Sequence, residues 1–65
     1  MTNIDAEREL DSLLKYGINK LSDIQEELVA TFGFEQWEIN LAIKSKLDEG
    51  YTVIQQKNED YLVQV

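Results

Sequence analysis

The side chains that most often carry chemistry are scarce in this sequence, apart from carboxylates. The chain has 13 acidic residues but no histidine and no cysteine. This inventory excludes a zinc site, a histidine-based triad and a disulfide framework. No pair of carboxylates stands beside a nucleophile. The three glycines are isolated, so there is no glycine-rich phosphate loop either. We therefore expect a protein that is not an enzyme, with no metal, no cofactor and no small-molecule substrate.

An apolar pair in the segment 35–49 offers contact chemistry in place of catalysis. Trp37 and Leu41 are four residues apart, so their side chains are neighbours if this segment is helical. At about 100° per residue, Lys44 and Asp48 fall on the same side as this pair. The opposite side collects the residues expected in the core, with Lys46 at its edge: Ile39, Ala42, Ile43 and Leu47.

Three helices are predicted to position these residues. Apolar residues at helical spacing, ended by Gly17, predict a first helix over about 4–16. A capping box formed by Ser22 and Gln25 predicts a second helix over about 23–32. Its inner side is expected to carry Ile24, Leu28 and Phe32, helped by Val29. The third helix is predicted over about 35–49 and is ended by Gly50.

The C-terminal part changes to short runs rich in β-branched and aromatic residues. These runs, 51–56 and 61–65, are separated by the polar segment 57–60 and predict a β-hairpin. The register stays open, because Asn58-Glu59 is not a strong two-residue turn. The chain has no proline and no internal repeat, and we expect one α+β domain over residues 1–65.

The segment around Gly33 resembles the winged helix-turn-helix family. It places apolar residues at set distances from this glycine: Leu28 and Val29 before it, Phe32 and Phe34 beside it, and Ile39 six positions beyond. The resemblance covers nearly the whole chain and implies three helices followed by a hairpin wing. It departs from the family at Glu35, where serine or threonine usually caps the third helix, and in its lack of positive charge on that helix and the wing.

The resemblance places the outward face of the third helix and the wing at the binding surface. We predict a regulatory module that binds a protein partner, or a second copy of itself, through Trp37, Leu41, Lys44, Glu38 and Asp48. Aromatic side chains are common at the dominant positions of such interfaces. One alternative for Trp37 stays open: the ring could fold back against the wing or the first helix and complete a small core.

The resemblance also implies an alternative function, a DNA-binding transcriptional regulator. The side chains that would contact DNA are Gln36, Asn40, Lys44, Lys57 and Asn58, although each could equally be ordinary solvated surface. A typical binder makes about 6–10 phosphate contacts, whereas only Lys44, Lys46 and Lys57 could reach a backbone held against this face. The net charge of −7 further disfavours DNA. It suits a basic protein partner, for which the chain would act as an acidic inhibitor or DNA mimic.

The sequence also favours a location. No stretch approaches the roughly 20 apolar residues that span a bilayer, and residues 1–5 lack the pattern of a secretory signal. We expect a cytoplasmic protein with no membrane partner. A lone small domain of this kind would suit an accessory protein of a phage or mobile element, although no residue shows it.

Overall fold

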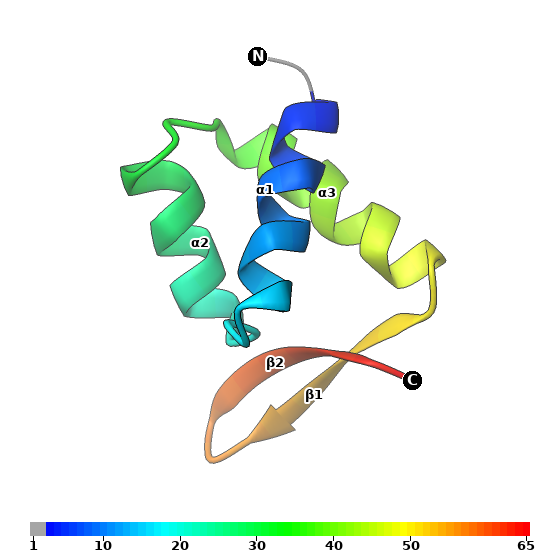
Figure 1. Ribbon diagram of the computed structural model, residues 1–65. Coiled ribbons are helices and arrows are strands. Elements are labelled where there is room, and N and C mark those ends of the chain that lie inside the picture. Colours follow the sequence, from blue (N-terminus) through cyan, green and yellow to red (C-terminus); the bar gives the residue numbers. More distant parts are fainter. Residues whose placement is uncertain (1–2) are drawn as a thin grey trace.

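The computed structural model describes residues 3–65, and the side chains of residues 5–65. Three helices come first: α1 (Asn3–Lys15), α2 (Leu21–Ala30) and α3 (Gln36–Asp48). Two antiparallel strands follow as a hairpin: β1 (Tyr51–Gln56) and β2 (Glu59–Gln64). Figure 1 shows the hairpin lying across the end of the helices where α1 ends and α2 begins. The predicted α+β layout of three helices and a wing is confirmed.

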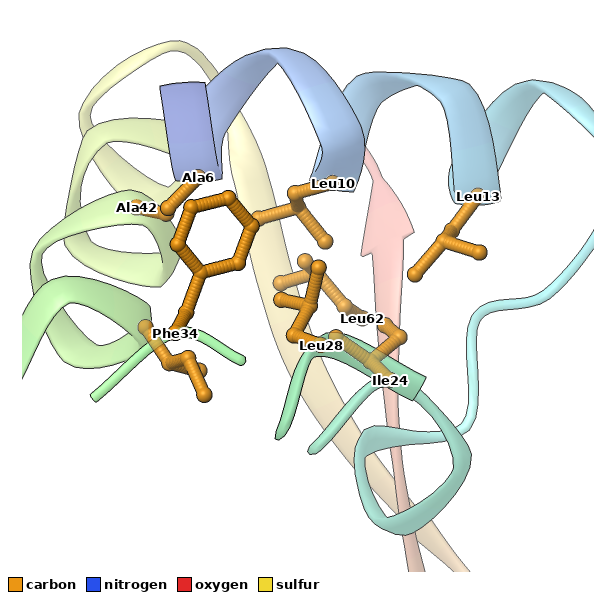
Figure 2. Close-up of a cluster of buried hydrophobic side chains, with 9 residues drawn as sticks. Ala6, Leu10, Leu13, Ile24, Leu28, Phe34, Ala42 and Leu62 are labelled. Atoms are coloured by element: carbon orange, nitrogen blue, oxygen red, sulfur yellow. The ribbon is translucent and has the colours of Figure 1, made fainter. Parts of the chain in front are cut away.

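A hydrophobic core joins the three helices to β2. Figure 2 shows Leu62 of β2 lying among side chains of α1 and α2. Burial of one large aliphatic side chain contributes about 1.5–3 kcal/mol, so Leu62 fixes the wing to the helices. The buried apolar residues are Ala6, Leu10, Leu13, Ile24, Leu28, Phe34, Ile39, Ala42 and Leu62.

Two glycines end the first two helices as predicted. Gly17 has a φ of +88°, and the N–H of Ile18 donates to the carbonyl of Leu13 at 2.9 Å. Gly33 has a φ of +72°, and the N–H of Phe34 donates to the carbonyl of Leu28 at 3.1 Å. This left-handed conformation costs little for glycine and lets the chain turn sharply between helices.

The predicted start of α2 is wrong. The helix begins at Leu21, with Lys20 in an extended conformation as its N-cap, and no side chain caps it. The box expected from Ser22 and Gln25 therefore does not form. Lys20 is held instead by a β-bridge to Tyr61 of β2. Tertiary pairing thus sets this helix start, and a local sequence pattern could not show it.

The hairpin turn is tighter than the sequence suggested. β2 begins at Glu59 instead of residue 61, and Gln56 pairs directly with Glu59. The two intervening residues, Lys57 and Asn58, have φ values of 52° and 66°. Two successive residues with positive φ are typical of a type I′ turn, whose twist matches that of antiparallel strands. This turn sets the register that the sequence left open.

Two residues predicted to lie in the core are exposed. Val29 lies about 100° around α2 from the fully buried Leu28. Leu47 lies about 80° around α3 from the fully buried Ile39, and 42% of its surface is exposed. The buried side of each helix is therefore narrower than the sequence analysis assumed, and both residues lie outside it. Within residues 3–65, no helix is long and apolar enough to cross a membrane.

Candidate functional site

The outward face of α3 carries an exposed apolar pair. Trp37 is 54% exposed and Leu41 is 40% exposed, whereas Ile39 on the inward side is fully buried. The indole Nε1 of Trp37 donates a hydrogen bond to Oε2 of Glu35 at 2.5 Å, which holds the ring over the start of α3. The alternative in which Trp37 completes the core is therefore wrong. Lys44 and Asp48 are also exposed on this helix. We call Trp37, Leu41, Lys44 and Asp48 the α3 face.

Glu38 does not belong to this face. It is only 4% exposed, so it cannot contact a partner, and its prediction as a binding residue is wrong. Its position near the start of α3 explains the burial. Oε1 of Glu38 accepts a hydrogen bond from the backbone N–H of Glu35 at 3.0 Å, as the third residue of a capping box does. The carboxylate thus caps the helix on which the α3 face is built.

Lys46 is also withdrawn from the surface. It is 4% exposed and lies about 20° around α3 from Ile39, near the middle of the inward side. Its ammonium contacts Asp11 of α1 and lies 3.2 Å from Glu49 and 5.9 Å from the centre of the Tyr51 ring. Burial acts to lower the pKa of Lys46, but hydrogen bonds to Asp11 and Glu49 outweigh it and raise the pKa. The expectation that Lys46 could reach a DNA backbone is wrong.

The polar residues proposed for base contacts are tied to one another. Gln36 and Gln25 of α2 exchange hydrogen bonds between their side-chain amides, and one of the two measures 3.0 Å. Gln36 also donates to Oδ1 of Asn40 at 2.9 Å. These exposed amides join α2 to the start of α3. A base edge would have to compete with these contacts before Gln36 or Asn40 could read it.

The wing tip holds the last two predicted contact residues. Lys57 and Asn58 are exposed and form the turn between β1 and β2. A second lysine near the wing is Lys20, whose ammonium Nζ lies 3.7 Å from Oε2 of Glu59. Lys44 and Lys57 are then the cations of α3 and the wing that form no ion pair within residues 3–65.

Exposed acidic side chains outnumber these two lysines on α3 and the wing. The exposed acids of α3, its ends and the wing are Glu35, Asp48, Glu49 and Asp60. Two free cations fall well short of the roughly 6–10 phosphate contacts of a typical DNA-binding protein. On α3 itself, the exposed pair Trp37 and Leu41 lies between Glu35 at the start of the helix and Asp48 at its end, both of which are exposed.

A pocket elsewhere on the molecule is lined mainly by apolar and amide residues. It has a volume of about 270 Å³, opens between the end of α1 and the wing, and is lined by Leu14, Gly17, Asn19, Tyr51, Leu62, Val63 and Gln64. None of these residues pairs a nucleophile with a base. In the part of the chain that the structure describes, no three side chains are grouped to hold a metal ion.

Two features of this surface escaped sequence reasoning. Gln25 anchors the amide group of Gln36, a contact across two helices with no local signal. Val53 and Ile54 of β1 are both exposed. The run Tyr51–Gln56 contains no charged residue. This absence of charge was the sequence signal that could have indicated a strand available for contact with another molecule.

Comparison of the chain with protein-family models, with curated proteins and with solved structures finds no match.

Proposed function

We propose that this chain is a non-enzymatic regulatory module of winged-helix type that binds a protein partner through the α3 face. The observation that carries the proposal is the exposure of Trp37 and Leu41, at 54% and 40%, four residues apart on one helix. Large apolar side chains grouped on a surface lose contact with water when a partner covers them. Tryptophan is among the residues that most often dominate the binding energy of such contacts.

The charge around the pair supports a basic partner. Glu35 lies beside the indole, and Asp48 lies on the same side of α3. The whole chain has a net charge of −7. Complementary charge speeds association and rejects acidic competitors. A partner with a basic, partly apolar surface fits these features, and a protein's own nucleic-acid-binding surface would be one of this class.

DNA binding is the second candidate function. The exposed positions of Lys44, Lys57 and Asn58, on the third helix and the wing tip, favour it. The burial of Lys46 and the amide contacts of Gln36 and Asn40 weigh against it. A mobility-shift assay with duplex DNA separates the candidates. Retention at about 0.1–0.2 M salt with a steep salt dependence would favour DNA, and no retention would favour the protein partner.

The protein-binding proposal is tested by two leucine substitutions on the same helix. Leu41→Glu places a charge in the α3 face, whereas Leu47→Glu places one at an equally exposed leucine about 120° around the helix. Pull-downs from the native host would use wild type and both variants, with the helical circular dichroism of each as a check on folding. We expect capture by wild type and Leu47→Glu, and its loss with Leu41→Glu. A protein retained equally by Leu41→Glu would contradict the proposed face.

A further inference from the structure

Along β1, the backbone N–H and C=O groups of successive residues point alternately toward β2 and away from it. Two observations show which residues point toward β2. Gln56 and Glu59 close a two-residue turn, so they exchange hydrogen bonds with each other. At the other end of the hairpin, the N–H of Val65 donates to the carbonyl of Gly50 at 3.0 Å. Both ends therefore assign the even-numbered residues of β1 to the ladder with β2. The backbone N–H and C=O groups of the odd-numbered residues point away from β2: Tyr51, Val53 and Gln55.

β1 is the strand whose outer edge is open. On β2, the outward N–H of Leu62 donates to the carbonyl of Asn19 at 2.8 Å, and Tyr61 bridges to Lys20. No comparable contact covers β1 within residues 3–65. Figure 1 shows β1 as the outer strand, with β2 between it and the α1–α2 connection. Residues 52–56 are all exposed.

This edge lacks the features that usually prevent strand pairing. Proteins protect an open edge with charges, proline, bulges or a very short strand. β1 is six residues long, has the sequence Tyr-Thr-Val-Ile-Gln-Gln and pairs with β2 without a bulge. Because the chain has a net charge of −7, two copies repel each other in most orientations. An uncharged strand is where two copies approach with the least repulsion.

We propose that two copies of this chain pair through their β1 edges, antiparallel about a two-fold axis at Val53, and form one four-stranded sheet. Val53 then lies opposite Val53 of the second copy, and Tyr51 lies opposite Gln55 of the second copy. Each copy contributes three N–H donors, so all the outward groups are paired in six hydrogen bonds. An axis at Thr52 or Ile54 would leave one of the three outward residues of each copy unpaired.

The charges at the two ends of β1 complement each other in this register. Lys57 follows β1 at the wing tip, and Asp48 and Glu49 precede it at the end of α3. An antiparallel pair about Val53 brings the wing tip of one copy beside the end of α3 in the other. The exposed Lys57 therefore meets carboxylates at both ends of the interface. A second copy thus satisfies both the backbone groups and the charges of this edge.

Cysteine substitution tests the register directly, because the chain has no cysteine of its own. Across the axis, the Cα atoms of the two Val53 residues would lie about 5.5 Å apart, within the roughly 4.4–6.8 Å that a disulfide spans. In the same register each Ile54 faces Thr52 of the second copy, so the Cα atoms of the two Ile54 residues would lie about 9 Å apart. Val53 and Ile54 are 40% and 37% exposed, so Ile54→Cys is a matched control for random collision. On mild oxidation we expect Val53→Cys to form a covalent dimer and Ile54→Cys to remain monomeric.

A second measurement uses the unmodified chain. A single six-residue strand pair buries less than the ~1,200 Å² typical of stable complexes, so the dimer belongs to the weak class. Sedimentation equilibrium over about 0.01–1 mM should show a monomer–dimer transition. Wild type that stays monomeric throughout, or equal cross-linking of Val53→Cys and Ile54→Cys, would overturn the proposal. Repeating the cross-linking with Leu41→Glu added separates this interface from the α3 face, and we expect the covalent dimer to persist.

Discussion

The ammonium of Lys46 contacts the carboxylate of Asp11, and this ion pair connects the C-terminal half of α3 to α1. The lysine lies in the middle of the inward side of α3, where the sequence would place an apolar residue. Its hydrocarbon stem fills that position while its charge reaches the edge of the interface. Together with the buried Ile39 and Ala42, this contact lies on the side of α3 opposite Trp37 and Leu41.

The first prediction separates the packing of Lys46 from its charge. Lys46→Ala removes both the stem and the ion pairs, and we expect it to lower the free energy of unfolding by about 2 kcal/mol. Lys46→Met keeps most of the stem, and Asp11 is half exposed and remains hydrated without its partner. We therefore expect a loss below about 1 kcal/mol for Lys46→Met. Urea denaturation measures both, and equal losses would show that packing is not the larger contribution.

The second prediction concerns pH and the neighbouring Glu7. A hydrogen bond to Glu49, then burial and the repulsion from Glu49, raise the pKa of Glu7 above its usual value of 4.5. A carboxyl with a raised pKa in the folded state stabilises the fold below its unfolded pKa, and this contribution is lost as pH rises through the folded pKa. Glu7→Gln removes the titration. We expect the variant to gain a few tenths of a kcal/mol relative to wild type between pH 4 and pH 7.

Thermal denaturation at a series of pH values checks this prediction. Glu9→Gln, two residues along α1 and about 200° around it, is the control for removing one carboxylate from this helix. A constant difference between Glu7→Gln and wild type across this range would contradict the raised pKa of Glu7.

The third prediction contrasts two residues of α3. Ile39 is fully buried, so Ile39→Ala should lower the free energy of unfolding by about 2–5 kcal/mol. Trp37 is 54% exposed, so Trp37→Ala should cost about 1 kcal/mol or less and leave the helical circular dichroism unchanged. A loss for Trp37→Ala that matches the loss for Ile39→Ala would place the indole in the core and remove the basis for the α3 face.

The helices of this fold could be predicted from the sequence because their signals are local. The apolar spacing and the glycines Gly17 and Gly33 marked the helices within a few residues, and the inward position of Ile39 followed from helical geometry. The start of α2 could not be predicted, since Lys20 is held by Tyr61, a residue far along the chain. The burial of Lys46 could not be predicted either, because hydropathy ranks a lysine as exposed unless its ion-pair partner is known.

The α3 face was predicted with one error for a related reason. Trp37, Leu41, Lys44 and Asp48 lie where the helical spacing placed them. Glu38 lies about 100° around α3 from Trp37, at the edge of the predicted face, and its carboxylate accepts a hydrogen bond from the N–H of Glu35. That contact depends on the helix beginning at Gln36. The start of this helix was predicted within one residue, so the error arose from an unforeseen side-chain contact and not from a misplaced helix boundary.

The last prediction addresses the turn at Lys57 and Asn58, on which the phase of β1 depends. Both residues have positive φ, a conformation that suits asparagine and glycine better than lysine. Replacing the pair by Asn-Gly (Lys57→Asn with Asn58→Gly) should raise the free energy of unfolding by about 0.5–1 kcal/mol. Lys57→Val should lower it by about 1–2 kcal/mol, since a β-branched residue is disfavoured at positive φ. Urea denaturation gives both values. If both variants match wild type, the turn is longer than two residues, and the assignment of Val53 to the open edge fails with it.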